Sequence, residues 1–234
     1  MLDGTLLNLM QKQEETDNMK DKKETEEILK RLKKRYPVKE GFLNFETPFQ
    51  IGIAVLLSAQ TTDRRVNIVT EELFKVAGTP EDMYKLTEDE IRNYISSINF
   101  FNNKAKNIYK LTKMVMEEYN GIFPNTMEEL MKLPGIGRKS ANVIMLEGYK
   151  NPQGVAIDTH AKRICNKTGI SYEKEPDKIE KDLISKIDKK YYFDANHLFV
   201  MHGREICIAR NPKCNICPIN DLCEERKKEN KETK

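Results

Sequence analysis

Apolar residues recur through most of the chain with the spacing of an α-helix. The clearest segments contain Ile91, Tyr94, Ile95 and Ile98; Ile108, Leu111 and Val115; and Ile179, Leu183 and Ile187. Residues three, four and seven positions apart lie on one face of a helix, whereas a half-buried strand alternates every second residue. No segment of the sequence shows convincing strand alternation, so we predict an all-α fold.

Capping residues and prolines mark the expected helix starts. They occur at Thr47-Pro48, Thr79-Pro80, Thr87-Glu88, Asn125-Thr126 and Glu175-Pro176. Hydroxyl and acidic side chains satisfy the free amides of a first turn, and proline fits its geometry. Gly121 and Gly169 are expected to end helices. Residues 49–59 are apolar on nearly every side, which predicts the central buried helix.

The composition indicates a soluble chain with polar ends. The longest apolar run, residues 51–57, is far too short to cross a bilayer, so no membrane partner is expected. The net charge is only +3, and binding to nucleic acid would therefore require a local basic patch. Residues 1–23 and 226–234 are rich in charges and amides and poor in apolar anchors, which is typical of flexible tails.

Four cysteines lie within seventeen residues near the C-terminal end, at Cys207, Cys214, Cys217 and Cys223. Thiolates this close together can bind one [4Fe–4S] cluster or one zinc ion. A structural zinc site usually has two Cys-x2-Cys pairs, and this segment has one, which favours the cluster. Zinc remains the alternative at this stage. The fifth cysteine, Cys165, lies in an apolar helical stretch and is expected to be buried.

A short glycine turn separates two expected helices. The first covers residues 126–133 and ends at Pro134, and the second begins at Arg138 after Gly135-Ile136-Gly137. Two glycines permit positive φ and close approach of another surface, while the amides at the start of the second helix can bind a phosphate. The alternative is a plain helix-turn-helix corner, because short motifs give frequent false matches.

Lys139 occupies the first turn of the second helix. A cation opposes the helix dipole there, so a purely structural sequence would more often place an acid at this position. The lysine is therefore a candidate nucleophile. Asp158 lies at the expected start of a later helix and would, taken alone, be a helix cap. Paired with Lys139 and a phosphate site, it becomes a candidate catalytic carboxylate.

Four motifs together resemble the endonuclease III family of helix-hairpin-helix DNA glycosylases. They are LPGIGRKSANVI at 133–144, VAIDTH at 155–160, LLSAQTTD at 56–63 and HGR at 202–204, and the cysteine series accompanies them. The resemblance covers residues 24–225 or so. It implies a [4Fe–4S] cluster and an active site in a cleft between two domains. The domains would be a six-helix barrel at 41–151 and a cluster domain made of the helix at 24–40 and residues 152–225, with tails at 1–23 and 226–234.

The resemblance also implies roles for single residues. Lys139 would attack the sugar of an oxidised pyrimidine nucleotide, release the base and form a Schiff base that breaks the strand by β-elimination. Asp158 would stabilise the positive charge on the sugar. Gln60 would fill the gap left by the extruded base, and Phe100 would press against the opposite strand, where the family often has an aliphatic residue.

The backbone of the DNA would lie against the hairpin and the cysteine loop. Gly135, Gly137 and Arg138 are the expected DNA-binding residues of the hairpin. Arg210 and Lys213, between the first two cluster cysteines, would supply the local basic patch, although each alone could be an ordinary solvated side chain.

The resulting prediction is a base-excision repair glycosylase and abasic-site lyase. Its partner would be duplex DNA with damaged bases or abasic sites, and it would act as a monomer in a prokaryotic cytoplasm, associated with the nucleoid. One alternative is a monofunctional mismatch glycosylase, although such relatives lack a lysine at the position of Lys139. The other is a non-catalytic iron–sulfur DNA-binding regulator, which would need no pairing of Lys139 with Asp158.

Overall fold

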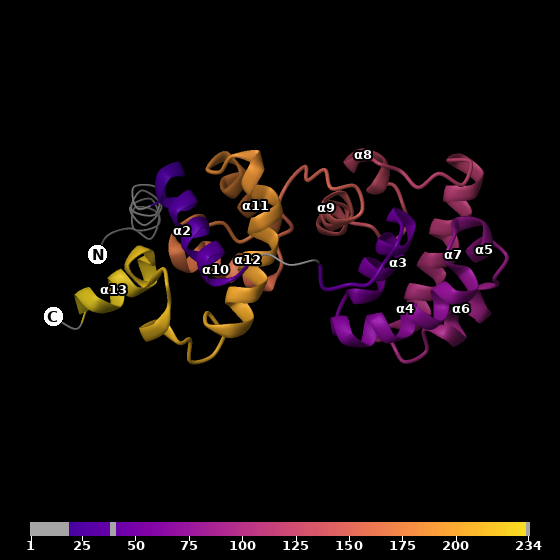
Figure 1. The fold of residues 1–234 in the computed structure, drawn as a ribbon, viewed down its shortest axis with the longest axis horizontal. Helices are drawn as coiled ribbons and strands as arrows, with labels where there is room; N and C mark the ends of the chain where they lie inside the picture. The colour runs from indigo at the N-terminus through magenta and orange to yellow at the C-terminus, as the bar shows by residue number, and fades with distance from the viewer. Residues whose placement is uncertain (1–18, 38–40, 233–234) are drawn as a thin grey trace, which may run out of the picture. The chain divides into compact units, whose positions relative to one another are not determined.

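The computed structural model describes residues 19–37 and 41–232, and within these ranges every regular element is helical (Figure 1). The predicted all-α fold is confirmed. The chain divides into two compact units. Unit 1 takes its described residues from Met1–Lys39 and Gly154–Lys234, and unit 2 takes its residues from Glu40–Gln153. Each unit has a hydrophobic core of its own.

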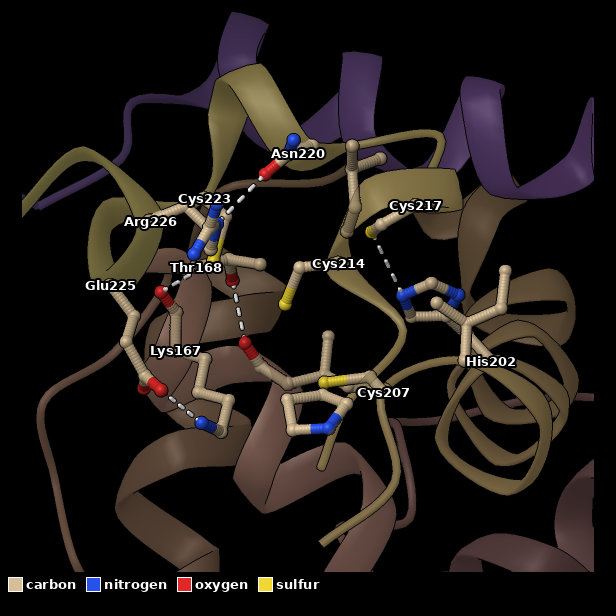
Figure 2. Close-up of a pocket in the computed structure, with 14 residues that line it drawn as sticks. Lys167, Thr168, His202, Cys207, Cys214, Cys217, Asn220, Cys223, Glu225 and Arg226 are labelled. Carbon is tan, nitrogen blue, oxygen red and sulfur yellow. Dashed lines mark hydrogen bonds and ion pairs between the residues drawn. The ribbon is translucent and has the colours of Figure 1, made fainter. Parts of the chain in front are cut away.

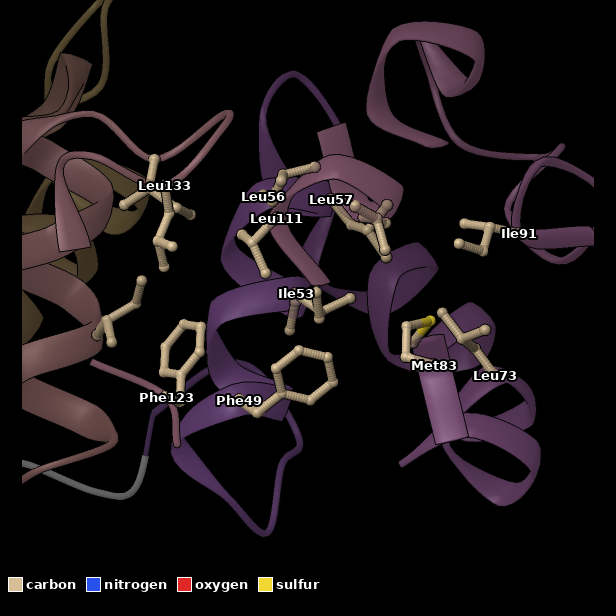
Figure 3. Close-up of a cluster of buried hydrophobic side chains, with 14 of the residues drawn as sticks. Phe49, Ile53, Leu56, Leu57, Leu73, Met83, Ile91, Leu111, Phe123 and Leu133 are labelled. Atoms are coloured by element: carbon tan, nitrogen blue, oxygen red, sulfur yellow. The ribbon is translucent and has the colours of Figure 1, made fainter. Parts of the chain in front are cut away.

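Unit 2 is built around one apolar helix, α3 (Pro48–Ser58), whose residues from Phe49 to Leu57 are all buried. The hydroxyl of Thr47 accepts the amide of Gln50 and Pro48 fits the first turn, so the helix begins where the sequence predicts. Figure 3 shows the apolar side chains gathered along this helix. The prediction of a central buried helix over 49–59 is confirmed.

The other helices of unit 2 pack around this core. They are α4 (Asp63–Ala77), α5 (Pro80–Tyr84), α6 (Glu88–Tyr94), α7 (Phe101–Glu118), α8 (Met127–Leu130) and α9 (Arg138–Glu147). The predicted starts at Thr79, Thr87 and Thr126 are confirmed, since each hydroxyl accepts an amide three residues ahead. Helices α4, α7 and α9 each contact α3, so α9 is held directly on the buried helix.

Unit 1 combines a helix from the start of the chain with the C-terminal helices. Its helices are α2 (Lys22–Arg35), α10 (Thr159–Thr168), α11 (Pro176–Ser185), α12 (Tyr192–Glu205) and α13 (Glu224–Glu232), and its 3₁₀ turns are η1 (Lys189–Tyr191), η2 (Cys214–Ile216) and η3 (Asn220–Leu222). Helix α12 contacts both α2 and α10. Gly169 ends α10 with φ of 82°, as predicted. Cys165 is fully buried, also as predicted.

The predicted tails are wrong where the structure describes them. Lys20 is only 3% exposed and its ammonium forms ion pairs with Glu24 and Glu224. Asp21 caps α2, so the fold begins before residue 24. At the other end, residues 224–232 form α13, and Glu225 pairs with Lys167 on α10. Charged pairs between distant segments hold both ends, and local composition gives no sign of such pairing. Residues 1–18 and 233–234 of the predicted tails lie outside the described residues.

Candidate active site and cluster pocket

The hairpin between α8 and α9 has one glycine in the left-handed region and one in an extended conformation. Gly135 has φ of +83°, and a Cβ atom there would lie 2.9 Å from Leu56 Cδ1. Gly137 has φ of −95°, so the expected positive φ is found only at Gly135, and a Cβ atom at Gly137 would meet no protein atom within 4 Å. Close approach of DNA to Gly137 stays a prediction. Ile136 is buried and anchors the turn, as expected. The helix predicted over 126–133 is shorter, because only Met127–Leu130 are α-helical before a series of turns reaches Pro134.

Helix α9 begins at Arg138 with its first amides uncapped. Gly137 is the N-cap residue and has no side chain to accept them. Lys139 lies in this first turn and its side chain is exposed, while Arg138 is partly buried. No ion pair is formed by Lys139 among the described residues of unit 2. The turn therefore presents free N–H groups and an unpaired ammonium on the surface of its unit, which suits an anionic ligand.

Asp158 is the N-cap of α10 in unit 1. Its Oδ1 atom accepts the amide of Ala161 at 2.8 Å, and its main-chain oxygen accepts the amide of Lys162. The buried residues Val155 and Ile157 hold the extended segment that leads into this cap. The capping role considered from the sequence is thus real. It occupies one carboxylate oxygen, and the side chain remains partly exposed.

The four cysteines of the C-terminal segment line a single pocket (Figure 2). Its wall is completed by apolar side chains that include Ile164, Ile206 and Ile219. No three cysteine, histidine or acidic side chains of residues 19–37 and 41–232 are arranged to hold one metal ion. A [4Fe–4S] cluster takes each thiolate on a different iron, and the four thiols around one pocket fit it.

The cysteine pocket is largely apolar, and this environment changes the pKa values of its thiols. Burial raises the pKa of Cys217 to about 11, and it also raises the pKa values of Cys207 and Cys223. These thiols would have to lose their protons in order to hold a metal group, and such binding would be coupled to folding of the loop. Arg210 and Lys213 are both exposed on the segment that joins Cys207 to Cys214. A phosphate contact through them remains a prediction.

Gln60 and Phe100 both have left-handed backbone conformations in unit 2. Gln60 has φ of 55° and Phe100 has φ of 58°, values that side chains other than glycine rarely adopt. Phe100 is the N-cap of α7 and is 61% exposed. The side-chain amide of Asn99 donates to the carbonyl of Gln60 at 2.6 Å. Because Asn99 directly precedes Phe100, the loops that carry Gln60 and Phe100 are neighbours.

Two family models match the chain. The first, described as the HhH-GPD superfamily of base-excision DNA repair proteins, matches residues 53–189, and the second, the iron–sulfur binding domain of endonuclease III, matches residues 207–223. The endonuclease III of Haemophilus influenzae is 42% identical over 202 residues, which are 86% of this chain and 95% of that protein. The chain belongs to the endonuclease III family. The Bacillus subtilis endonuclease III is 40% identical over 210 residues, covering 89% of this chain and 95% of the relative.

Solved structures agree with this family assignment. A trapped covalent endonuclease III–DNA intermediate matches with a TM-score of 0.84 and 38% identity, covering 90% of this chain and 99% of that chain. A non-covalent endonuclease III–DNA complex matches with the same TM-score and identity over 91% and 100% of the two chains. A thermostable thymine-DNA glycosylase shares the fold with a TM-score of 0.77, at 23% identity.

As an endonuclease III family member, the chain carries a [4Fe–4S] cluster. Cys207, Cys214, Cys217 and Cys223 are the residues around the pocket that would hold it. Two polar groups beside the pocket were not anticipated from the sequence. His202 Nε2 lies 3.6 Å from Cys217 Sγ, and Tyr36 Oη lies 3.3 Å from His202 Nδ1. Burial lowers the pKa of His202 to about 4, so this ring is neutral.

A second unexpected residue lies in unit 2. Lys104 is buried, and its ammonium donates to main-chain oxygens of the segment that leads to Gln60. The helical spacing of Ile108, Leu111 and Val115 gave no indication that Lys104 is buried, because its acceptors come from a distant part of the chain.

Proposed function

We propose that this endonuclease III family member uses Lys139 as its nucleophile and Asp158 as the carboxylate that supports it. The chain is a base-excision repair glycosylase with abasic-site lyase activity, acts on oxidised pyrimidines in DNA, and cleaves the strand by β-elimination through a lysine Schiff base. One observation, more than any other, supports the choice of Lys139 as the nucleophile. Lys139 is exposed and unpaired in its unit, in the first turn of α9, directly after a glycine turn with uncapped amides.

The chemistry requires a neutral amine at Lys139. Its Nζ atom attacks C1′ of the damaged nucleotide, the bond from C1′ to the base breaks, and the base leaves with the electron pair and gains a proton. Loss of protons from the nitrogen and opening of the sugar ring give the Schiff base. Removal of a proton from C2′ then expels the 3′ phosphate oxygen, which cleaves the strand. Hydrolysis of the imine releases Lys139 for the next cycle.

Asp158 suits two needs of this sequence. The departure of the base leaves positive charge on the sugar, and a carboxylate stabilises that charge in the transition state. A carboxylate can also receive the proton that the attacking amine loses. The cap geometry supports this proposal, because one oxygen accepts the amide of Ala161 and fixes the side chain while the group remains partly exposed.

DNA binding by this chain would rest on main-chain amides and scattered cations. We assign phosphate contacts to the hairpin amides at Gly135 and Gly137 and to the side chains of Arg138, Arg210 and Lys213. Such contacts position the duplex without reading its sequence. Gln60 and Phe100 would enter the space left by the extruded nucleotide, since the sugar carbon is inaccessible while the base is stacked. The exposure of both side chains supports this role.

The family resemblance also suggests how the units divide the work. The barrel, residues 41–151, would carry the hairpin and Lys139, and the cluster domain, residues 24–40 with 152–225, would carry Asp158. The substrate would be duplex DNA with damaged bases or abasic sites, bound by a monomer. The relatives named above are bacterial proteins, which supports action on the chromosome in a prokaryotic cytoplasm. No helix within residues 19–37 and 41–232 is both long and apolar enough to span a membrane.

A substrate panel tests the proposed function. Duplexes that carry thymine glycol, dihydrouracil, an abasic site, a uracil mismatch or 8-oxoguanine are incubated with the cluster-loaded protein, and base release and strand cleavage are measured separately. We expect both events on the oxidised pyrimidines, and cleavage of the abasic duplex. Base release without cleavage would indicate a monofunctional glycosylase, and binding without either event would indicate a regulator.

A further inference from the structure

Lys104, in the second turn of α7, is buried, whereas the other described lysines of unit 2 are exposed. The residue is 6% exposed, and its Nζ atom donates to Leu57 O at 2.9 Å, to Ala59 O at 2.6 Å and to Thr61 Oγ1 at 3.2 Å. No carboxylate of the described residues forms an ion pair with it. Three acceptors thus match the three protons of one ammonium group.

A buried lysine without a carboxylate partner is costly, so its position requires an explanation. Burial lowers the pKa of Lys104, which reflects the cost of removing the charge from water. The carbonyls it contacts lie at the C-terminal end of α3, where the helix dipole places partial negative charge. The lysine therefore acts as a distant C-terminal cap of α3. Capping α3 does not by itself require a buried ammonium group, because a polar side chain at the surface could cap the helix without the cost of removing a charge from water. We infer that the buried lysine serves the loop that follows α3.

The ammonium group of Lys104 is bonded to the residues on either side of Gln60 in the sequence. Ala59 precedes Gln60 and Thr61 follows it, and each supplies an oxygen to the same ammonium group. Asn99 donates to the carbonyl of Gln60 itself. A left-handed conformation is unfavourable for a residue other than glycine and persists only where the surroundings enforce it. Together with the turn bond from the amide of Thr61 to Ser58 O at 3.1 Å, these three hydrogen bonds hold Gln60 in that conformation.

The same lysine is tied to Phe100. The main-chain amide of Lys104 donates to Phe100 O at 3.1 Å, which forms the first turn of α7. Any residue at this position would make that main-chain bond, and the ammonium group of Lys104 therefore joins the Gln60 loop to the helical turn that follows Phe100. Gln60 and Phe100 are both exposed and both have positive φ, while Lys104 is buried.

We propose that Lys104 is a positioning residue for base extrusion, which holds the Gln60 loop and the Phe100 loop as one rigid wedge. This inference rests on the proposed roles of Gln60 and Phe100. Lys104 itself touches neither DNA nor the reacting atoms. Its contribution would be needed when a paired base must leave the helix, and would be largely dispensable when the base is already absent.

The test compares two substrates under single-turnover conditions. Lys104→Met keeps the length of the side chain and removes the donors, and Lys106→Met, on the exposed surface of the same helix, is the matched control. We expect Lys104→Met to lose about tenfold or more in base release from a paired thymine glycol, since stacking and pairing must be broken there, and to retain cleavage of a pre-formed abasic site. Equal losses on the two substrates would overturn the proposal, because they would mean a general role in folding.

A double-mutant cycle separates this inference from the function on which it rests. If Lys104 acts through the wedge, Lys104→Met should cause little further loss in a Gln60→Ala background, and fully multiplicative losses would contradict the proposal. If Gln60→Ala alone left the ratio of the two rates unchanged, the proposed role of Gln60 would be wrong. If Gln60→Ala slowed base release from the paired lesion and Lys104→Met did not, only the Lys104 proposal would fail.

A spectroscopic signal and a milder variant complete the test. A 2-aminopurine placed beside the lesion brightens when its neighbour is extruded, and Lys104→Met should reduce that increase while Lys106→Met does not. If Lys104→Met fails to fold, Lys104→Gln, which retains two N–H donors, takes its place in every assay. A normal fluorescence increase in the folded variant would contradict the proposal.

Discussion

Asp158 combines a structural role, visible in its hydrogen bond to Ala161, with the chemical role that we propose. The two roles respond differently to loss of charge. Asparagine caps a helix about as well as aspartate, whereas a neutral amide cannot stabilise a developing cation. One substitution can therefore separate them.

We expect Asp158→Asn to fold and to bind damaged DNA, but to release bases about a hundredfold more slowly, if the carboxylate acts chiefly in the transition state. Single-turnover base release from a thymine glycol duplex is the measurement. Asp21→Asn is the control, because Asp21 is also the N-cap of a unit 1 helix and accepts the amide of Glu24 at 2.8 Å. Comparable rates for the two variants would show that Asp158 is only a cap.

The single residues that could be predicted from the sequence are those whose chemistry is local. The cysteine spacing, the glycine turn and the odd position of Lys139 are visible within short windows of sequence. Lys104 and His202 were not predicted in their roles, because their partners lie far away in the chain. Lys104 bonds to oxygens more than forty residues earlier, and His202 lies between Tyr36 and Cys217. No periodicity or spacing reports contacts of this kind.

The turn between α8 and α9 should be sensitive to substitution at one glycine and tolerant at the other. Gly135→Ala would place a Cβ against Leu56 Cδ1 in a left-handed conformation, and we expect it to lower the free energy of unfolding by about 1–3 kcal/mol. Gly137→Ala meets no atom within 4 Å and should change it by less than about 1 kcal/mol. Urea unfolding of both variants is the measurement, and equal destabilisation would contradict this account of the hairpin.

The junction between the start of α2 and α13 should depend on pH. Burial by itself raises the pKa of Glu224, but hydrogen bonds from Lys20 and Lys227 outweigh it and hold the pKa below its ordinary value. Because the folded state then binds fewer protons than the unfolded state, the stabilisation is complete above the ordinary glutamate pKa. It is lost as the pH falls through the depressed folded value.

Hydrogen exchange of the α13 amides tests this pH dependence, with Lys20→Met as the reference. The variant removes both ion pairs of Lys20, to Glu24 and to Glu224, at every pH, and only the Glu224 pair involves α13. We expect greater protection of the natural chain at pH 7 and convergence of the two proteins at acid pH. A difference that stayed constant across this range would assign the protection to something other than the Glu224 carboxylate.

Most helices could be predicted because their signals are local, but two kinds of element could not. The caps at Thr47, Thr79, Thr87 and Thr126 marked real helix starts, and the apolar run after Thr47 identified the buried α3. Helix α13 has almost no apolar residues, and its ion pairs to other segments are invisible in its composition. The α-helical part of α8 is short because turns take over before Pro134, and the sequence pattern before that proline did not show where the change occurs.

The whole chain should contain one cluster, and its loss should affect unit 1 first. We expect the purified protein to be yellow-brown with about four irons and four sulfides per chain. Cys214→Ser should lower both contents and increase proteolysis of the segment between Cys207 and Cys223, because metal binding and local folding are coupled. Cys165→Ser is the control, since Cys165 is buried outside the cysteine pocket. A colourless protein with one zinc would contradict the assignment.

Borohydride trapping during turnover tests the lysine mechanism most directly. The natural protein and Lys113→Gln, which changes an exposed lysine of α7, should become covalently attached to a thymine glycol duplex, with the adduct mapped by mass spectrometry to Lys139. Lys139→Gln should give no adduct and no base release while still binding the DNA, because the phosphate site is made by main-chain amides. An adduct on a different residue, or efficient trapping by Lys139→Gln, would contradict the assignment of Lys139 as the nucleophile.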